Sequence, residues 1–520
     1  MTERTAGVLR DRRLRMDAHA DRSLQVRETH CAGIVLVGDR AWKFKKPVVL
    51  PFLDFSTAEA RQRACERELR LNRRFSPDVY LGLATLTLPD GGREPLVLMR
   101  RMPEDRRLAT LVRSGADVTG PLRALARQLA VVHARSPHSQ EIDESAGIAA
   151  LRRRWADNLA EARRAVPQVL DEATVEEVDR LVERFLRARG PLFERRVAQG
   201  CAVDGHGDLM AEDIFCLDEG PRALDCLEFD DSLRYVDRLD DAAFLCMDLE
   251  RLGAPEQAAA FVGWYAEFCG DPAPPSLRHH YVAYRAFLRA KIACLQQDRG
   301  AAAVAEARSL LGLAHRHLQA GRVTLTLVGG LPGTGKTTLA RALADRLGAV
   351  VLSSDRLRKE LARLDPRRCA AAPYGKGIYD PEHTRQAYGE LLHQARVLLE
   401  QGESVVLDAS WSAAGRREEA RTLAVETCSD LTEVCCRAAE GLVEERLGLR
   451  RAERRLAGDF SDADTTVAAA MGRHFASWPE ALAVDTDAAP ETLAEGIAQR
   501  VQPVRVTYAT PRPRSKMGPG

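Results

Sequence analysis

The segment Gly330 to Thr337 constrains this chain more than any other, because its sequence GLPGTGKT matches the pattern G-x-x-x-x-G-K-[ST]. A strand-like apolar run, VTLTLVGG, enters it, and Leu339, Leu343 and Leu347 mark one face of the helix expected to leave it. Glycines at such a turn let backbone N–H groups close around phosphates, and the helix N-terminus adds partial positive charge. The segment therefore predicts a phosphate-binding loop; a chance glycine-rich turn is the alternative.

The pattern assigns separate duties to the residues of this loop. We expect Lys336 to reach the β- and γ-phosphate oxygens of ATP, and Thr337 to hold Mg²⁺. The other residues expected to contact the nucleotide are Gly330, Pro332, Gly333, Thr334, Gly335 and Thr338. ATP and Mg²⁺ are therefore the predicted cofactors.

Strands and helices are expected to alternate after Gly321. Apolar runs at 323–330, 349–355 and 403–410 read as strands, and helical patterns fill 337–347 and 383–401. This order is typical of an α/β P-loop NTPase with a parallel sheet. Its ligands are expected at the carboxyl ends of the strands.

Two aspartates follow strands of this predicted sheet. Asp355 comes just after the second strand, where a carboxylate can take a proton from an acceptor hydroxyl, and Arg358, three residues on, can clamp the acceptor. Asp408 ends the run Val405-Val406-Leu407 and suits a Mg²⁺ carboxylate. For both aspartates, capping of the following helix is the alternative role.

A basic helical run follows the nucleotide core. Arg446 and Arg450 share one face at a spacing of four residues, and further arginines follow them. We expect one or two of these to act from a mobile lid that brings positive charge to the transferring phosphate. A solvated helix face is the alternative.

The first part of the chain has a different element order. A hairpin is expected at 34–44 around Gly38-Asp39, a helix after the capping-box pattern Ser56 to Glu59, and a second strand pair around 90–92. Helical periodicity then fills about 121–196 and 237–319. The sequence predicts an α+β protein-kinase-like domain with a small β lobe and a large α lobe at 1–320, the P-loop domain at 321–508, and a disordered tail at 509–520.

A second set of carboxylates lies in the first domain. His206-Gly207-Asp208-Leu209 is followed by Asp213, and Asp225 comes after a turn at 218–220. Kinase-like chemistry needs these in order: a base near the acceptor hydroxyl, then two polar ligands for Mg²⁺. We assign Asp208 as base and Asp213 with Asp225 as metal ligands. His133, on an apolar helix, reads as a packing residue.

The P-loop half, over about 322–501, resembles small P-loop kinases of the gluconate kinase, polynucleotide kinase and zeta-toxin type, including those called AAA-family ATPases. In that group an Asp after the second strand and an Arg three residues later act as base and acceptor clamp. The resemblance places these roles on Asp355 and Arg358. The stretch Ser461-Asp462-Ala463 is also similar to this group.

The first half, over about 28–295, resembles the aminoglycoside phosphotransferase family, whose catalytic loop reads H-G-D-[hydrophobic]-x-x-x-N. The segments AWKFKKP at 41–47 and FLDF at 52–55 match the branch found fused ahead of a P-loop kinase. By this resemblance Lys43 contacts ATP phosphates and Glu68 pairs with it, with Lys45 and Glu66 as register alternatives, and Asp208 is the base. The chain departs from the pattern in having Asp213 where Asn is usual, and we find no clear Gly-rich loop.

Charge and composition limit the partners. Lys plus Arg number 76 and Asp plus Glu 75, so a net charge of +1 offers no bulk field for nucleic acid or an anionic membrane. No apolar run approaches the length of a membrane span, and the 12 cysteines are scattered without a C-x-x-C pair. We expect a cytoplasmic protein with reduced thiols, whose partner is a small-molecule phosphoryl acceptor. End phosphorylation of nucleic acid is disfavoured by the neutral charge.

These observations lead to two hypotheses of function. The first is an ATP-binding phosphotransferase with two kinase-like modules that transfers the γ-phosphate of ATP to a hydroxyl acceptor. The second is a regulatory protein, in which a non-catalytic N-terminal module senses a ligand and controls the C-terminal P-loop ATPase.

Overall fold

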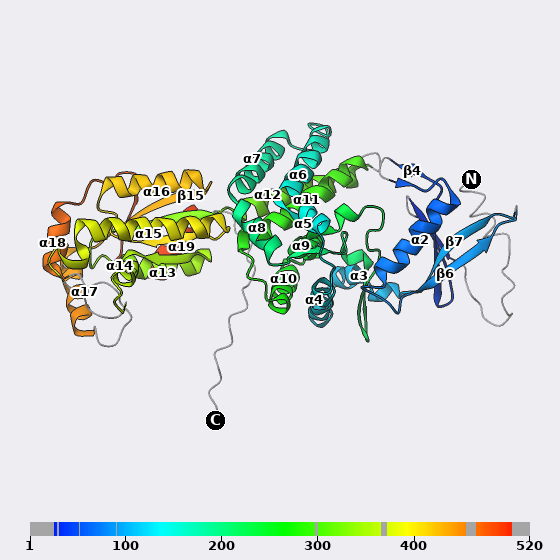
Figure 1. The fold of residues 1–520 in the computed structure, drawn as a ribbon, viewed down its shortest axis with the longest axis horizontal. Coiled ribbons are helices and arrows are strands. Elements are labelled where there is room, and N and C mark those ends of the chain that lie inside the picture. The colour runs from blue at the N-terminus through cyan, green and yellow to red at the C-terminus, as the bar shows by residue number, and fades with distance from the viewer. Residues whose placement is uncertain are drawn as a thin grey trace, which may run out of the picture.

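The computed structural model describes residues 25–28, 31–50, 53–89, 91–296, 300–365, 372–453 and 464–501. Two predicted features, the tail at 509–520 and the stretch Ser461 to Ala463, lie outside these residues. Figure 1 shows the P-loop domain at the left, a helical lobe in the middle and a β lobe at the right.

The small lobe is a five-stranded sheet with the order β1-β2-β3-β7-β6, accompanied by one long helix. Its elements are β1 (Gln25–Glu28), β2 (Ala32–Val37), β3 (Arg40–Lys45), α2 (Ala58–Asn72), β6 (Tyr80–Thr87) and β7 (Arg93–Arg100). The predicted hairpin forms between β2 and β3, and the predicted strand pair forms between β6 and β7. The cap of α2 is Thr57 rather than Ser56, because the Thr57 hydroxyl accepts from the Ala60 N–H at 3.1 Å.

The large lobe consists mainly of helices around one apolar core that contains Trp155, Leu245 and Phe287. Its helices are α3 (Leu108–Arg113), α4 (Thr119–Ala134), α5 (Gln140–Ala146), α6 (Ile148–Arg163), α7 (Glu172–Ala188), α8 (Gly190–Ala198), α9 (Arg238–Arg251), α10 (Pro255–Cys269), α11 (Pro275–Leu295) and α12 (Ala301–Ala320). A small β lobe followed by a larger helical lobe confirms the predicted kinase-like fold class of this half.

Short strands interrupt the helices of the large lobe between α8 and α9. They are β8 (Ala202–Asp204), β9 (Ile214–Leu217), β10 (Gly220–Ala223) and β11 (Tyr235–Asp237). The strands pair as β8 with β11 and β9 with β10, and the β9–β10 hairpin contains the predicted turn at 218–220. The loops beside these strands carry the predicted carboxylates of the first domain.

The C-terminal domain is a parallel sheet of order β13-β14-β12-β15-β16, so the predicted α/β P-loop fold is confirmed. Its strands are β12 (Thr324–Gly329), β13 (Val350–Ser353), β14 (Val405–Asp408), β15 (Asp430–Arg437) and β16 (Leu482–Asp485). Its helices are α13 (Lys336–Leu347), α14 (Ser354–Leu361), α15 (Pro381–Glu400), α16 (Ala414–Glu426), α17 (Glu440–Glu453), α18 (Thr465–Arg473) and α19 (Pro490–Val501).

The two domains meet where α12 ends at Ala320 and β12 begins at Thr324. The boundary at 320/321 stays a prediction. In the part of the chain that the structure describes, no helix combines the length and apolar character required to cross a membrane.

Candidate active sites

The phosphate-binding loop leaves the central strand β12 and ends at Gly335, the N-cap of α13. A side chain at Gly330, whose φ is +140°, would place its Cβ 2.6 Å from the carbonyl oxygen of Cys436, so only glycine fits there. The Thr334 hydroxyl donates to the Leu331 carbonyl at 2.7 Å and closes the turn. The remaining predicted nucleotide contacts, Pro332, Gly333, Lys336, Thr337 and Thr338, lie in this loop and in the first turn of α13.

Thr337 and Asp408 meet beside this loop, as the sequence predicts. The Thr337 hydroxyl donates to Asp408 Oδ2 at 2.9 Å, because β12 and β14 are neighbours and Asp408 ends β14. Asp408 is 3% exposed, and its Oδ1 accepts no hydrogen bond of good geometry from the described residues. Capping is excluded as its role, since α16 begins at Ala414 with Ala413 as N-cap.

The charge state of Asp408 responds to its neighbours. Burial raises its pKa above the ordinary value, the Asp355 carboxylate raises it further, and the Lys336 ammonium lowers it. A divalent cation beside Asp408 would favour the ionised form, so a hydroxyl and a buried carboxylate here fit Mg²⁺.

Asp355 and Arg358 lie on α14, at the end of the strand next to β14. Asp355 is not a helix cap, because α14 begins at Ser354 with Ser353 as N-cap. Its half-buried carboxylate makes no hydrogen bond or ion pair with another described residue. Arg358 is 7% exposed and turns toward α15, where it donates to Thr384 Oγ1 at 2.8 Å and to the Ile378 carbonyl at 3.0 Å. A role of Arg358 as acceptor clamp stays a prediction.

Arg446 of α17 contacts the other side of the phosphate-binding loop. Its guanidinium donates to the Thr486 hydroxyl at 2.9 Å and to the Thr486 carbonyl at 2.6 Å. Thr486 in turn donates to the Thr334 carbonyl at 2.9 Å. Arg446 is therefore placed beside the loop rather than on a fully solvated face. Arg450 lies one turn further along α17, and its side chain is outside the described residues.

In the N-terminal domain the structure brings Lys43 and Glu68 together, from β3 and α2. The Lys43 ammonium lies 2.8 Å from Glu68 Oε1 and 2.5 Å from Asp225 Oδ1. Glu68 is fully buried, whereas the alternative Glu66 is exposed and accepts from Gln62. The structure therefore favours the Lys43–Glu68 register over one through Glu66.

A second lysine joins this group. Lys43 and Lys45 point to the same face of β3, and the Lys45 ammonium lies 2.7 Å from Glu68 Oε2 and in contact with Glu228. Although burial opposes its charge, Glu68 and Glu228 hold the pKa of Lys45 above its ordinary value. The central Glu68 thus has one lysine on each oxygen. Sequence reasoning assigned no role to Glu228; its signal was a second carboxylate, three residues after Asp225, in the otherwise apolar run Leu224 to Phe229.

Asp208, Asp213 and Asp225 influence one another electrostatically. Burial raises the pKa of Asp208 to about 6, and Arg289 opposes this shift. Burial, followed by the carboxylates of Asp225 and Asp208, raises the pKa of Asp213 well above its ordinary value. Loss of solvation works against ionisation of Asp225, but the Lys43 ammonium holds its pKa below the ordinary value. Asp213 and Asp225 therefore form a carboxylate pair that a divalent cation would stabilise.

The loop that carries Asp208 is anchored from behind. Asp241 of α9 accepts from the backbone N–H groups of His206 and Gly207 at 2.9 and 2.8 Å. His133 lies 3.0 Å from the same carboxylate and 2.6 Å from the Tyr265 hydroxyl, so it is a packing residue as predicted. Sequence reasoning missed Asp241, because nothing local to α9 signals a contact with a loop 35 residues earlier.

Thr337 with Asp408, and Asp213 with Asp225, are the two candidate metal-binding pairs. Across the described ranges, no group of three or more His, Cys, Asp or Glu side chains is arranged to hold a metal ion by itself. Each proposed Mg²⁺ position here uses at most two protein groups, as in kinases where phosphate oxygens complete the coordination.

Known proteins resemble this chain in sequence or in structure. The family model described as AAA domain matches residues 325–478, which confirms the resemblance predicted for the C-terminal half. Two of the similar solved structures are a putative kinase from Chloroflexus aurantiacus J-10-fl (22% identity, 35% of this chain, 99% of that chain, TM-score 0.28) and a choline/ethanolamine kinase family protein from Mesorhizobium loti (14%, 61%, 98%, TM-score 0.37).

A curated relative covers almost the whole chain. Uncharacterized protein Rv2004c from Mycobacterium tuberculosis (strain ATCC 25618 / H37Rv) is 44% identical over 480 residues, which are 92% of this chain and 95% of the relative. Identity at this level over nearly the full length of both proteins shows common descent, and the chain belongs to the same family as Rv2004c.

Proposed function

We propose that this protein is an ATP-dependent phosphotransferase with two nucleotide sites, each of which transfers the γ-phosphoryl group to a hydroxyl of a small-molecule acceptor. The observation that carries the proposal is the hydrogen bond from Thr337 to the buried Asp408 at 2.9 Å, near Lys336 and the carboxylate of Asp355, which has no partner among the described residues. Phosphoryl transfer requires mainly positioning and charge neutralisation, and these groups can supply both.

In the C-terminal site each residue has one task. Lys336 neutralises charge on the β- and γ-phosphates, and the first-turn N–H groups of α13 hold the phosphate oxygens. Thr337 and Asp408 would hold Mg²⁺, which when bound neutralises charge that develops on the phosphate oxygens. Asp355 accepts the proton of the acceptor hydroxyl. The lid residues Arg446 and Arg450, together with Arg358, add positive charge around the transferring group.

In the N-terminal site the corresponding tasks fall on residues from both lobes. Lys43, fixed by Glu68 at 2.8 Å, would contact the phosphates. Asp213 and Asp225 would hold Mg²⁺. The like charges of the two carboxylates oppose their ionisation, and a bound cation would favour it. Asp208, with a pKa raised to about 6, is suited to accept a proton near neutral pH.

A regulatory role of the N-terminal domain is the second candidate. It is favoured by Asp213, because a third carboxylate near Asp208 and Asp225 places more negative charge around ATP than the usual Asn would. A domain of this kind would bind a ligand without turnover and act on the P-loop site.

Calorimetric titration of Mg-ATP into the full chain separates these possibilities. We expect two binding events in the wild type, loss of one in Lys336→Ala, and loss of the other in Asp225→Ala. An acceptor screen with ATP then tests transfer in each single-site variant. If Lys336→Ala loses no Mg-ATP binding event relative to the wild type, the phosphotransferase proposal is refuted. ATP binding without transfer in Lys336→Ala, under conditions where Asp225→Ala transfers, would favour the regulatory role.

A further inference from the structure

Arg289 of α11 faces the loop that carries Asp208, the predicted base of the N-terminal site. Arg285, one turn earlier on α11, fixes this direction, because its Nη1 donates to the carbonyl of Gly207 at 3.5 Å. Gly207 directly precedes Asp208 in the chain. Since residues four positions apart are neighbours on one helix face, the side chain of Arg289 extends from α11 toward the same loop.

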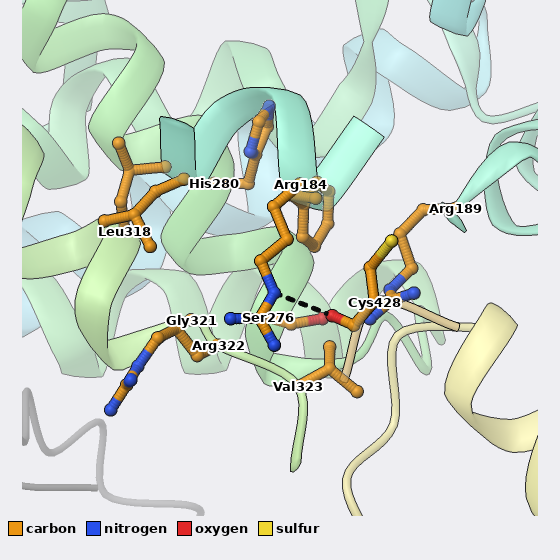
Figure 2. A pocket seen from close by; sticks show the side chains of 11 residues that line it. Arg184, Arg189, Ser276, His280, Leu318, Gly321, Arg322, Val323 and Cys428 are labelled. Atoms are coloured by element: carbon orange, nitrogen blue, oxygen red, sulfur yellow. Dashed lines mark hydrogen bonds between the residues drawn. The ribbon is translucent and has the colours of Figure 1, made fainter. Parts of the chain in front are cut away.

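Arg289 has no partner of its own in the part of the chain that the structure describes. Guanidinium groups elsewhere in the helical lobe are held by backbone carbonyls: Arg184 donates to that of Cys428 at 3.1 Å, and Arg189 to that of Thr427 at 2.7 Å. The first of these hydrogen bonds is drawn in Figure 2. Arg289 is half-buried, yet it makes no hydrogen bond or ion pair with another described residue. Its N–H donors are therefore available to a ligand.

The carboxylates of α9 that lie behind this loop are already paired. Asp240 lies 2.7 Å from Arg285, and Asp248 lies 2.7 Å from Arg251. Asp208, in contrast, makes no hydrogen bond or ion pair with another described residue. A cation of α11 and the predicted base thus lie near each other without direct contact, and each keeps its polar atoms free for a third group.

The charges of Arg289 and Lys43 act on different carboxylates of the N-terminal site. Burial raises the pKa of Asp208 to about 6, and the charge that opposes this shift most is that of Arg289. Burial also disfavours ionisation of Asp213 and Asp225, and there the Lys43 ammonium acts in the opposite direction. Lys43 therefore serves the carboxylates expected to hold Mg²⁺, and Arg289 serves the base, where the acceptor hydroxyl has to approach.

We propose that Arg289 binds an anionic group of the phosphoryl acceptor, so that the acceptor of the N-terminal site is an alcohol that also carries a carboxylate or a phosphate. This inference rests on the transfer proposed above for that site. A guanidinium binds either anionic group through two parallel N–H donors, which orients the rest of the molecule. The hydroxyl proton then passes to Asp208, the hydroxyl oxygen bonds to the γ-phosphorus, and ADP leaves. A cationic acceptor would be repelled by Arg289.

Four probes with one three-carbon skeleton test this charge preference: glycerol, D-glycerate, glycerol 3-phosphate and 3-aminopropane-1,2-diol. Each is titrated calorimetrically into the full chain that carries Lys336→Ala, which removes phosphate binding at the P-loop, in the presence of Mg²⁺ and a non-hydrolysable ATP analogue. We expect one or both of the anionic probes to bind, and the neutral and the cationic probe to show no binding. A preference of this kind would identify the charge of the acceptor before its full structure is known.

Variants of α11 test whether Arg289 is the residue that binds the anion. Arg289→Met should weaken binding of the anionic probe by about 10- to 100-fold, as for loss of a charged hydrogen-bond partner. Lys291→Met is the matched control, since Lys291 is paired with Asn158 at 2.9 Å and with Glu161 at 3.1 Å, and it should bind the probe as before. If Arg289→Met does not fold, Arg289→Lys, which keeps the charge but loses the paired donors, should weaken binding by a smaller factor.

Several outcomes would overturn the proposal. These are absence of binding by both anionic probes, equal binding of glycerol or the amine, and anion binding that persists unchanged in Arg289→Met. If Arg289→Met lowers transfer while the anionic probe still binds, Arg289 acts on the base alone and the proposal is equally wrong. Failure of the proposed function is distinguishable, because the ATP analogue would then not bind to the Lys336→Ala chain, or anion binding that requires Arg289 would occur without any transfer.

Discussion

Replacement of Asp208 by Asn should make the protein more stable and less active, because the structure holds this carboxylate where its charge is disfavoured. Burial raises the pKa of Asp208 from 3.8 to about 6 in the folded protein. At 1.36 kcal/mol per unit this corresponds to about 3 kcal/mol of native-state destabilisation when the group is ionised. Because the side chain keeps some solvent contact, we expect an observed effect of about 1–3 kcal/mol.

The direction of the pH dependence follows from how tightly the folded and the unfolded protein bind the proton of Asp208. A carboxyl with a raised folded pKa binds its proton more tightly in the native state, so its ionisation costs stability only as pH rises. Below about pH 4 both states are protonated, and Asp208→Asn should match the wild type. The difference should grow between about pH 4 and pH 6 and be complete above that range. Transfer at this site should meanwhile fall by about 10²–10⁴-fold, as for loss of a general base.

The assay is thermal and urea unfolding of the full chain across this pH range, with the N-terminal transition followed separately. Asp157→Asn on α6, an exposed carboxylate in the same domain, is the control and should change little at any pH. A variant less stable than the wild type, or a gain in stability that does not vary with pH, would refute the reasoning. Unchanged transfer in Asp208→Asn would remove Asp208 as the base.

Three further perturbations test other contacts. Asp355→Asn should suppress transfer at the C-terminal site while ATP binding, measured by calorimetry, is retained; loss of both would contradict its role as base. Thr337→Val should weaken the Mg²⁺ dependence of ATP binding. If the wild type binds ATP equally well in Mg²⁺ and in EDTA, Thr337 is not a Mg²⁺ ligand. Lys45→Met should raise the KM for ATP at the N-terminal site, because it leaves Glu68 Oε2 unpaired and frees Glu68 to move away from Lys43. Lys46→Met, which removes the ion pair with the exposed Glu28 at 2.9 Å, is its control and should leave KM unchanged.

The parts of the fold that could be predicted are those whose signal is local. The phosphate-binding loop needs left-handed glycines at fixed offsets, so its sequence alone identifies it, and Asp408 could be found because it ends an apolar run. The hairpin at Gly38 is equally local, since Gly38 has a φ of +56°. In both cases one short segment determines the geometry.

The parts that were missed depend on contacts between distant segments. Lys45 and Glu228 are 183 residues apart, and neither helical periodicity nor strand alternation reports such a pairing. The hydrogen bond from Arg358 to Thr384 likewise depends on how α15 packs against α14, and no local pattern reports it. Whether Asp355 and Asp408 cap a helix could be decided only from the first residue of the helix that follows each. Sequence patterns locate a helix start only to within a few residues.

The strand β15 has a consequence for any attempt to dissect this protein into fragments. Its first residue, Asp430, is paired with Arg184 of α7, and its last residues reach the loop at Gly330, where the Cys436 carbonyl lies against the glycine. A fragment that begins at residue 321 would therefore leave Thr427 without Arg189 and Asp430 without Arg184, at the opposite end of the strand from the nucleotide, although Arg322 would remain paired with Asp430 at 3.0 Å. Kinetic constants of such a fragment would describe a sheet in which the start of β15 has lost its contacts with the N-terminal domain, and they should be compared with a full chain inactivated at Asp208 rather than with the wild type alone.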